Sequence, residues 1–573
     1  MMEKTELAEG VPIPDLSHRR VLIIMSALML GMLLAALDQT IVSTALPTIV
    51  ADLGGASHLS WVVVAYLLAA TVSTPLWGKL GDQYGRKFFF QTSIVIFLAG
   101  SICSGFSHSM LELIAFRSIQ GIGGGGLMVG TQAIVGDIVS PRDRGRYQGL
   151  FGAVFGVASI AGPLLGGVFV EQLSWRWIFY INVPIGIVAL AVIASQVPGH
   201  LRRVPHVIDY LGASILILAA GALVLFTSLG GTTYPWGSPT IVGLGVAGGI
   251  FVVVFALVER RATEPVLPLH LFKNRTFWVT SVVGFIVGFA MFGSITYLPA
   301  FFQIVHGESP TISGLQLLPL MAGMLVVSIA SGQIISHTGR YRAFPIAGTA
   351  LITIGLLLMS KMGVTTSGRT EALYMLVLGL GLGAVMQVLV LIVQNAVPYG
   401  ELGVATSGAT FFRSIGGSFG AAIFGAIFSN VLVGDLIRHL GHARLPAGLT
   451  PADITPASLG QLSPAALHGL VAAYAESIQT VFVIAAPVGI LAFAGAWLIP
   501  HVELRLGVSS HASPDASAAE AEAVPVASSA SSVEPVDSVD SVGRHVGGPR
   551  GPLRGARRPS RVHRGERGDR VLD

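Results

Sequence analysis

The sequence predicts an all-α integral membrane protein. Of its 573 residues, 52% are hydrophobic and only 11% are charged, and the mean hydropathy is +0.73. A soluble domain carries about 25% charged residues, and a soluble chain this apolar would expose large adhesive patches. Long stretches without charge recur along the chain, as expected for helices that cross a bilayer. These observations exclude most classes of soluble enzyme.

Fourteen transmembrane helices are predicted from stretches that lack Asp, Glu, Lys and Arg. A bilayer core needs about 20 apolar residues per helix. The first six stretches are 21–37, 59–78, 88–111, 118–136, 147–170 and 177–199. The stretch 210–258 is long enough for two helices, because its centre, from Gly230 to Pro239, has the composition of a turn. The last six stretches are 276–307, 309–339, 343–360, 372–400, 402–434 and 477–500, of which 402–434 contains Arg413.

The basic residues predict the orientation of the chain. With a cytoplasmic N-terminus, seventeen Lys and Arg residues fall in inside segments and five in outside loops. Positive residues accumulate on the cytoplasmic side, so both termini are expected in the cytoplasm. The Ala-, Gly- and Arg-rich composition predicts the cell inner (plasma) membrane. The first span is too long for a signal peptide and is interpreted as an uncleaved anchor.

The predicted spans divide the chain into five parts. They are a cytoplasmic segment (1–20), a six-helix half (21–200), two inserted helices with inside linkers (201–275), a second six-helix half (276–505) and a tail (506–573). The second half includes one long outside loop at 435–476. The tail is rich in Ala, Ser, Pro and Val and then in Arg, a composition that predicts disorder. Its arginines could contact anionic lipids, although a solvated extension is the simpler interpretation.

A short internal repeat indicates that the two six-helix halves are related. Gly78, Gly85 and Arg86 follow the second span, and Gly332, Gly339 and Arg340 follow the tenth at the same spacing, 254 residues later. Transporters built from paired halves tilt about a site near the bilayer midplane.

The first copy of this repeat resembles the signature loop of the major facilitator superfamily. Other stretches resemble its 14-span drug:proton antiporter branch, the EmrB/QacA type. They are Leu37 to Pro47, Arg117 to Gly121, Gly162 to Gly167 and Trp175 to Pro184. The resemblance covers about residues 20–500. It implies the major facilitator fold, with two six-helix halves and two inserted helices.

Asp38 in the first span and Arg117 in the fourth are candidates for coupling protons to substrate. A bare carboxylate within a membrane is costly, so Asp38 should be protonated, paired or in a wet cavity. Arg117 stays charged and needs polar partners, and Gln120 lies one turn on, on the same helix face. The resemblance implies that Asp38 exchanges a proton for cationic cargo and that Arg117 assists. Structural hydrogen bonding and helix packing are the alternatives.

The repeated loop is the candidate cytoplasmic gate. Glycines at 78 and 85 permit a tight turn and close helix approach. By resemblance, Asp82 should cap or pair with the first helix of the other half, and Arg86 should bridge to Asp137. Ser336 stands where the second copy would carry the acid, so a latch at Arg340 should be weaker. The alternative is that these charges only set topology.

The fifth span carries a dense set of small residues that resembles the antiporter motif and implies export. The set comprises Gly156, Gly162, Pro163, Gly166 and Gly167. Ordinary close packing is the alternative. Arg413 in the thirteenth span could meet an amide of span 12 or a carboxylate, and its functional and structural interpretations stay open. The remaining cavity candidates are Trp61, Tyr66, Phe292, Tyr297 and Gln387, whose aromatic faces and amides suit lipophilic cations.

These features predict a proton-coupled multidrug efflux transporter that exports lipophilic, often cationic, compounds by alternating access. The alternatives are an exporter of one endogenous metabolite, such as an antibiotic, siderophore or lipid, and a nutrient symporter. We expect no enzymatic activity, cofactor, metal site or nucleic-acid partner, because neither nucleotide-binding motifs nor catalytic pairs are found. The expected partners are small lipophilic substrates, protons and membrane lipids, and the chain is expected to act as a monomer.

Overall fold

A computed structural model describes residues 17–54, 59–140, 143–198, 209–231, 233–295, 297–440 and 463–501. Predictions for the N-terminal segment before residue 17, for the tail and for the centre of the 435–476 loop lie outside these residues. Within the described ranges the secondary structure is helical, apart from an isolated bridge between Gly230 and Tyr234.

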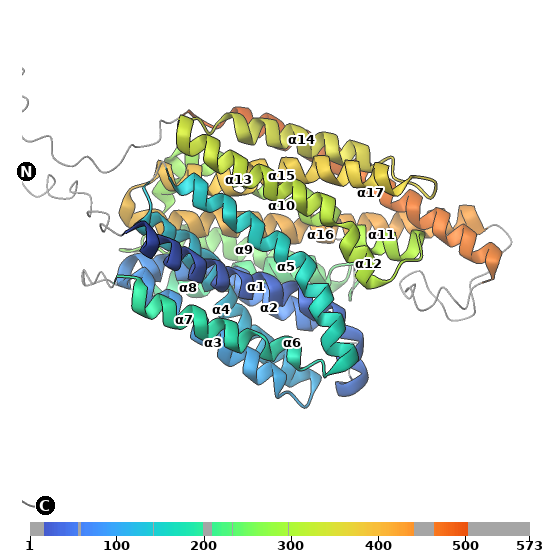
Figure 1. The fold of residues 1–573 in the computed structure, drawn as a ribbon, viewed down its shortest axis with the longest axis horizontal. Helices are drawn as coiled ribbons and strands as arrows, with labels where there is room; N and C mark the ends of the chain where they lie inside the picture. Colours follow the sequence, from blue (N-terminus) through green and yellow to red (C-terminus); the bar gives the residue numbers. More distant parts are fainter. Residues whose placement is uncertain are drawn as a thin grey trace, which may run out of the picture. The chain divides into compact units, whose positions relative to one another are not determined.

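The first six-helix half consists of seven helices that run from the blue to the teal part of the chain (Figure 1). Their bounds are α1 His18–Leu53, α2 Leu59–Tyr84, α3 Arg86–Gly105, α4 Met110–Ile138, α5 Arg144–Gln172, α6 Trp177–Tyr180 and α7 Asn182–Gln196. The two inserted helices are α8 Tyr210–Leu229 and α9 Pro239–Glu259, followed by a 3-10 turn, η3 Leu269–Lys273.

The second half runs from yellow-green to orange. Its helices are α10 Arg275–Ile295, α11 Leu298–Val305, α12 Pro310–Gln316, α13 Leu318–Thr338, α14 Ala343–Met359, α15 Gly368–Ala396, α16 Leu402–Leu440 and α17 Pro464–Trp497, with the short 3-10 turn η4 Tyr399–Glu401 before α16. Each predicted span falls on one helix or on two consecutive helices. By length and composition, eleven helices of the described chain could cross a membrane, and α14 and residues 275–291 of α10 form shorter apolar helices. The count of 14 spans therefore stays a prediction.

Several boundaries differ from the predicted spans, and prolines explain most of the breaks. The sixth span is divided at Ile181, shortly before Pro184, and the tenth is divided at Leu317, before Pro319. Proline suits the first turn of a helix and cannot continue a preceding one. The outside loop expected at 435–476 includes the end of α16, which runs to Leu440, and the beginning of α17 at Pro464.

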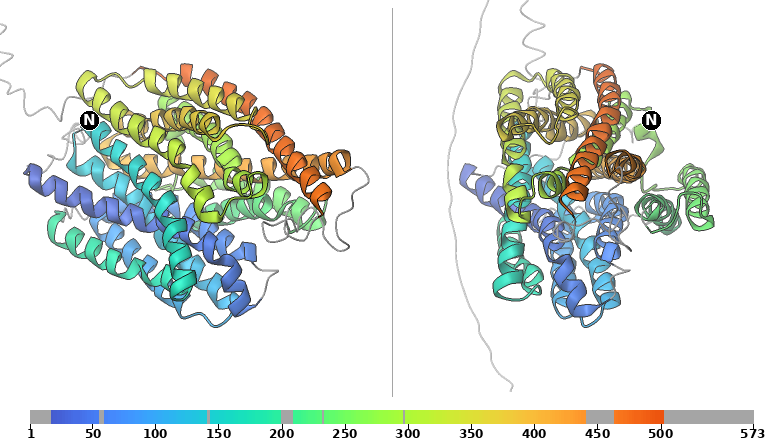
Figure 2. Two further views of the ribbon diagram at one scale, coloured as in Figure 1. Left: turned by 45° about the vertical axis from the view of Figure 1, so that its right-hand side comes forward. Right: turned by 90° about the vertical axis from the view of Figure 1, so that its right-hand side faces the viewer.

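The two halves have separate apolar cores. One cluster of buried side chains joins α1 to α5 and α7, and another joins α10, α11 and α13 to α17. A third cluster packs α8 and α9 against α2, α10, α15 and α16, so the inserted pair touches both halves. The right view of Figure 2 shows α8 and α9 (green) at one side of the two halves.

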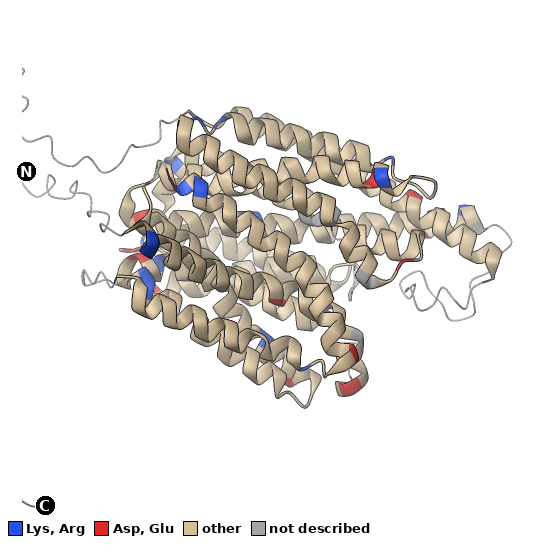
Figure 3. Ribbon diagram, viewed as in Figure 1, with Lys and Arg blue, Asp and Glu red and all other residues tan. Residues whose placement is uncertain are grey.

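Charged residues avoid the middle of the bundle. Most of the coloured Lys and Arg residues lie at the end where α1 begins (Figure 3). This end is the predicted cytoplasmic end, and we call it the inner end. Asp38, Arg117 and Arg413 are exceptions: the first two are buried within the helices, and Arg413 lies in the middle of α16 and is only partly exposed.

Candidate functional site

A buried ion pair joins α1 to α4. Arg117 Nη1 donates to Asp38 Oδ2, and the side chains of Asp38 and Arg117 are 0% and 1% exposed. Gln120 lies between them: its Oε1 accepts from Arg117 Nη1 at 2.8 Å, and its Nε2 donates to Asp38 Oδ1 at 2.8 Å. The structure thus brings the three predicted coupling residues into direct contact.

Further polar groups complete this cluster from α3 and α7. Asn182 Nδ2 donates to Ser101 Oγ at 3.0 Å and reaches Asp38 Oδ1 at 3.5 Å. Gln120 Nε2 also donates to Ser101 Oγ at 3.1 Å. The sequence analysis assigned no role to Asn182 or Ser101. Asn182 belongs to a quoted motif and is a polar residue at the edge of an apolar span, a signal that could have marked it, whereas Ser101 has none.

Arg117 is held by aromatic and backbone groups as well. Its guanidinium carbon lies 4.3 Å from the centroid of the Tyr66 ring and 5.8 Å from that of Phe179, and its Nε donates to the Val62 carbonyl at 3.3 Å. A cation over an aromatic face is stabilised by the ring quadrupole. Tyr66, which was predicted to line a substrate cavity, therefore faces the ion pair.

Glycines on α3 and α4 allow the helices to close around this cluster. A Cβ at Gly100 would lie 2.5 Å from the backbone nitrogen of Gln120, and one at Gly121 would lie 2.4 Å from the Tyr66 carbonyl. Small residues let membrane helices approach closely. The cluster is therefore enclosed by backbone on two sides, and neutralising Asp38 with a proton would remove the only carboxylate that pairs with Arg117 among the described residues.

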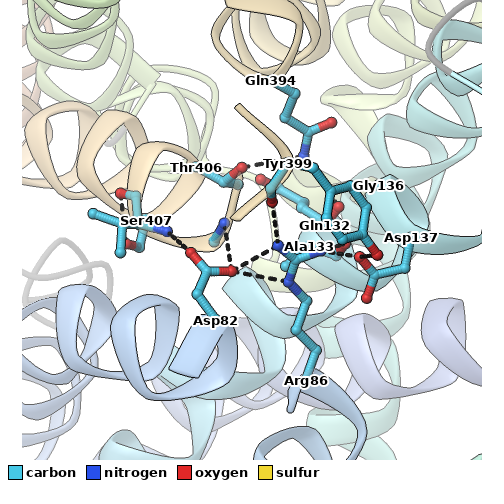
Figure 4. Close-up of polar contacts among 12 residues, drawn as sticks. Asp82, Arg86, Gln132, Ala133, Gly136, Asp137, Gln394, Tyr399, Thr406 and Ser407 are labelled. Carbon is cyan, nitrogen blue, oxygen red and sulfur yellow. Dashed lines mark hydrogen bonds and ion pairs between the residues drawn. The ribbon is translucent and has the colours of Figure 1, made fainter. Parts of the chain in front are cut away.

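A second polar network lies at the inner end, where α2 meets α16 (Figure 4). Asp82 accepts hydrogen bonds from the backbone N–H groups of Gly403 at 3.0 Å and Val404 at 2.8 Å. It also accepts from Arg86 Nε at 3.0 Å and Nη2 at 2.6 Å. The first N–H groups of a helix lack intrahelical partners and attract negative charge, so Asp82 binds the beginning of α16.

This result corrects the expected partner of Asp82. The expectation was the first helix of the other half, which is α10, and the observed partner is α16. The sequence predicts that Asp82 binds the beginning of a helix of the other half. The spatial order of the helices decides which helix of that half faces Asp82.

Arg86 links Asp82 to the end of α4. The expected ion pair between Arg86 and Asp137 is present. Tyr399 Oη donates to Asp137 Oδ1 at 2.7 Å, and the Tyr399 carbonyl accepts from Arg86 Nη2 at 3.2 Å. We call Asp82, Arg86, Asp137 and Tyr399, with the two N–H groups of α16, the inner latch. It ties α2, α3 and α4 of the first half to η4 and α16 of the second.

The two loop glycines serve the inner latch in different ways. Gly85 has φ +105°, a conformation that side chains disfavour, and it precedes the first residue of α3. A Cβ at Gly78 would lie 2.2 Å from Ser407 Oγ and 2.5 Å from the Gly403 carbonyl. Arg340, the counterpart of Arg86, is exposed, and its backbone N–H donates to Thr338 Oγ1 at 3.2 Å. The structure does not bring Arg340 into the inner latch.

A second contact between the halves joins α5 to α13. A Cβ at Gly332 would lie 2.1 Å from the Gly145 carbonyl, and Ser328 Oγ donates to the Gly149 carbonyl at 3.1 Å. Nearby, Gln148 Nε2 donates to Gln394 Oε1 at 3.3 Å. We call the contact between α2 and α16 and the contact between α5 and α13 the two seams. Both seams are closed at the inner end in this structure.

The residues of the predicted antiporter motif pack α5 against α1. A Cβ at Gly162 would lie 2.1 Å from Thr40 Oγ1, and one at Gly166 would lie 2.0 Å from Thr44 Oγ1. Thr40 Oγ1 also donates to the Ala158 carbonyl at 2.9 Å. Gly156 and Pro163 instead face the second half, and a Cβ at Gly167 would meet nothing within 4 Å. The motif therefore builds contacts both within the first half and across to the second.

The role of the predicted cavity residues stays a prediction, and the structure gives the surroundings of some of them. Tyr297 stacks near Phe428 with ring centroids 5.1 Å apart, Trp61 is half-buried, and the side chain of Phe292 lies outside the described residues. A cavity of about 120 Å³ beside α10 and α16 is lined by none of them. Within the described ranges no group of three or more His, Cys, Asp or Glu residues could hold a metal ion.

Comparison with known proteins agrees with this architecture. The model of the Major Facilitator Superfamily matches residues 28–421. The chain belongs to this superfamily. An uncharacterized MFS-type transporter of Mycobacterium tuberculosis is 47% identical over 86% of this chain and 71% of its own length. The multidrug transporter protein MdtP of Bacillus subtilis is 39% identical over 80% of this chain and 86% of its own length.

Solved structures of the superfamily share the fold. The proton:xylose symporter XylE superposes with a TM-score of 0.57 at 14% identity, over 86% of this chain and 98% of the symporter chain. The all-helical major facilitator fold expected from the sequence is confirmed. As a superfamily transporter, this chain is a membrane protein that acts on small molecules.

Proposed function

We propose that the chain is a proton-coupled multidrug efflux transporter that exports lipophilic, often cationic, compounds by alternating access. The names of relatives such as the multidrug transporter protein of Bacillus subtilis support the efflux class. The observation that carries the coupling is the buried pair of Asp38 and Arg117, because a titratable carboxylate within the helices is placed where a proton can be bound and released.

The contacts of Asp38 suggest how a proton would act. The carboxylate is held by one guanidinium and by the amides of Gln120 and Asn182. Protonation removes the charge that balances Arg117, so Arg117 and Gln120 must find other partners and α1 and α4 can shift. A cation close to Asp38 would compete with the proton for the same carboxylate, which is the exchange that antiport requires.

The inner contacts fit the second requirement, a barrier on one side of the bundle. With the inner latch and the α5/α13 seam closed, access from the inner end is blocked. Alternating access requires these contacts to open when cargo is collected. One proton charge moved through about 100 mV supplies about 2.3 kcal/mol, equivalent to about a 50-fold concentration ratio, since about 1.4 kcal/mol is tenfold.

The test uses the purified chain in proteoliposomes with an acidic interior. We expect ethidium to accumulate inside and to leave when an uncoupler collapses the proton gradient. Asp38→Asn should abolish this uptake, while Asp52→Asn, which changes an exposed carboxylate of the same helix, should retain it. Uptake by Asp38→Asn at the wild-type rate, at equal protein content, would contradict the proposal. Proton-driven ethidium movement in the direction of the protons would indicate a symporter instead.

A further inference from the structure

A second arginine inside the bundle, Arg413 of α16, has no counter-charge among the described residues. It lies eleven residues after Leu402, the first residue of α16. At 1.5 Å per residue this places it about 16 Å along the helix, near the middle of a bilayer core about 30 Å thick. A guanidinium stays charged there. Within the described ranges its side chain has no ion pair, hydrogen bond or aromatic face as a partner.

Arg413 does not face lipid. From residue 402 to residue 422, no residue of α16 is exposed. The side chain leaves α16 toward α10, where a Cβ at Gly288 would lie 3.2 Å from Arg413 Cγ. A Cβ at Gly284, one turn earlier on α10, would lie 3.8 Å from Leu389 Cδ1 of α15. The stem of Arg413 therefore packs against α10, close to where α10 meets α15.

Gln387 of α15 lies at the same level as Arg413. The helices α15 and α16 are consecutive and joined by a short connection, so they run in opposite directions. Gln394 Nε2 donates to Thr406 Oγ1 at 3.1 Å, which fixes the register of the two helices. Seven residues make two turns of a helix, so two turns beyond this bond the same two faces carry Gln387 and Arg413.

At the inner end, Gln394 of α15 contacts the first half. Gln394 donates to the Gln132 carbonyl of α4 at 3.1 Å, and Gln148 of α5 donates to Gln394. Two turns farther from the inner end, Gln387 is 6% exposed, and its Oε1 has no hydrogen-bond partner. A buried amide oxygen without a partner is uncommon. Gln387 thus lies two turns from a contact with the first half and level with Arg413, and neither side chain satisfies the other with a hydrogen bond.

We propose that Arg413 and Gln387 bind an anionic group of the cargo, a carboxylate or comparable oxyanion on a lipophilic molecule. The planar guanidinium offers several N–H groups in a geometry that matches a carboxylate. The Gln387 amide adds an N–H donor for the anion and an oxygen that accepts from a hydroxyl or N–H of the same molecule. Arg117 is not available for this task, because Asp38 already neutralises it. This inference rests on the proposed efflux function and extends its cargo to amphipathic acids and zwitterions.

The test measures binding to the purified full-length chain in detergent. The probe is 11-(dansylamino)undecanoic acid, compared with its primary amide, which has the same apolar part and no charge. Charge-assisted hydrogen bonds are among the strong ones, and we expect the wild type to prefer the acid about 10- to 100-fold. Arg413→Gln should remove this preference, Arg413→Lys should retain part of it, and Gln387→Leu should reduce it about threefold to tenfold.

A matched control and a folding check keep the test decisive. Arg369→Gln makes the same change at an exposed position near the beginning of α15 and should leave the preference unchanged. Variants are compared only if their elution profile and thermal midpoint match those of the wild type. If Arg413→Gln fails this check, Arg413→Lys and Gln387→Leu carry the test.

Two results would overturn the inference: equal binding of acid and amide by the wild type, or an unchanged preference in the folded Arg413 variants. Because this assay needs no proton gradient, its failure is distinct from failure of the proposed function. Proton-driven ethidium uptake with no preference for the acid would remove only the anion site. Preference for the acid without any uptake would remove only the efflux mechanism.

Discussion

The two inner seams contain equivalent glycines of the repeated loop and differ in one side chain. At the α2/α16 seam, Gly78 approaches Gly403, and at the α5/α13 seam, its repeat counterpart Gly332 approaches Gly145. Gly403 and Gly145 are each the second residue of their helix. One turn after the contact, however, the first seam has Asp82 and the second has Ser336.

This difference separates two roles that the repeated loop combines. The glycines bring backbones together in both seams, and at the first seam the charged Asp82 also binds the N–H groups at the beginning of the opposing helix and connects them to Arg86. We therefore expect close approach to depend on both copies of the loop and the electrostatic lock to depend on the first copy alone.

The largest effect is expected from removing the charge of Asp82. Asp82→Asn leaves Arg86 with one carboxylate and leaves the beginning of α16 without an anion. Breaking a buried pair on one side costs about 3–5 kcal/mol, so the inner end should open. The measurement is labelling by a water-soluble maleimide at Gln132→Cys, a buried position between the halves, in a Cys103→Ser background. Labelling should rise more than tenfold.

Asp143→Asn is the control for this prediction, because Asp143 is an exposed carboxylate of a neighbouring inside loop. Equal labelling of the Asp82 and Asp143 variants would show that the inner latch does not hold the seam closed.

Adding one methyl group to the glycine of the second seam should have the next largest effect. In Gly332→Ala the new Cβ would lie 2.1 Å from the Gly145 carbonyl, a backbone atom that cannot turn aside. Overpacking of this kind costs about 1–3 kcal/mol, and proton-driven ethidium uptake should fall about tenfold. Gly249→Ala, where a Cβ would meet nothing within 4 Å, is the matched control. The prediction fails if both variants transport alike.

Supplying the missing acid should make the two seams more alike. Ser336→Asp places a carboxylate one turn after Gly332, near the beginning of α5. A negative charge at a helix beginning contributes about 0.3–1 kcal/mol. Labelling at Gln132→Cys should slow about twofold to fivefold, and transport should slow with it. Ser336→Asn, which adds a similar volume without charge, should have neither effect, and faster labelling in the Asp variant would count against the comparison.

The smallest effect is expected from the outermost hydrogen bond of the inner latch. Tyr399→Phe removes the bond of 2.7 Å to Asp137 and leaves the Arg86 pair in place. One such bond contributes about 0.5–1.5 kcal/mol, or more when the acceptor is charged. We expect labelling at Gln132→Cys to rise about twofold to tenfold, less than in Asp82→Asn. Tyr210→Phe, at an exposed residue of α8, serves as the control, and an effect larger than that of Asp82→Asn would reverse the proposed order.

The sequence predicts contacts within a helix better than contacts between helices. The spacing of Arg117 and Gln120 placed both on one face of α4, and the structure shows them bonded. The amide of Asn182 reaches Asp38 from α7, and the hydroxyl of Ser101 on α3 bonds Asn182 and Gln120. No spacing along the chain indicates these contacts. The same limit explains why the partner of Asp82 was assigned to α10 instead of α16.

Helix interruptions and the surroundings of Arg413 show two further limits of prediction from the sequence. The prolines at 184 and 319 could have indicated the breaks, since each lies in the first turn of a new helix, but charge-free length alone does not reveal them. For Arg413, the requirement for a polar partner follows from its charge. The sequence offered amides of span 12, and only the register set by Gln394 and Thr406 shows that Gln387 lies level with Arg413.

The inner latch also determines the manner in which the bundle can come apart. Asp82 accepts from two backbone N–H groups and one guanidinium, and that guanidinium donates to two carboxylates and two backbone carbonyls. Breaking one of these bonds leaves a charge without one of the partners that balance it. A partly broken network is therefore less favourable than the fully closed or the fully open one. We expect such a network to resist small fluctuations and to break all of its bonds cooperatively. A partly opened gate, through which ions could leak during the transport cycle, should therefore be rare.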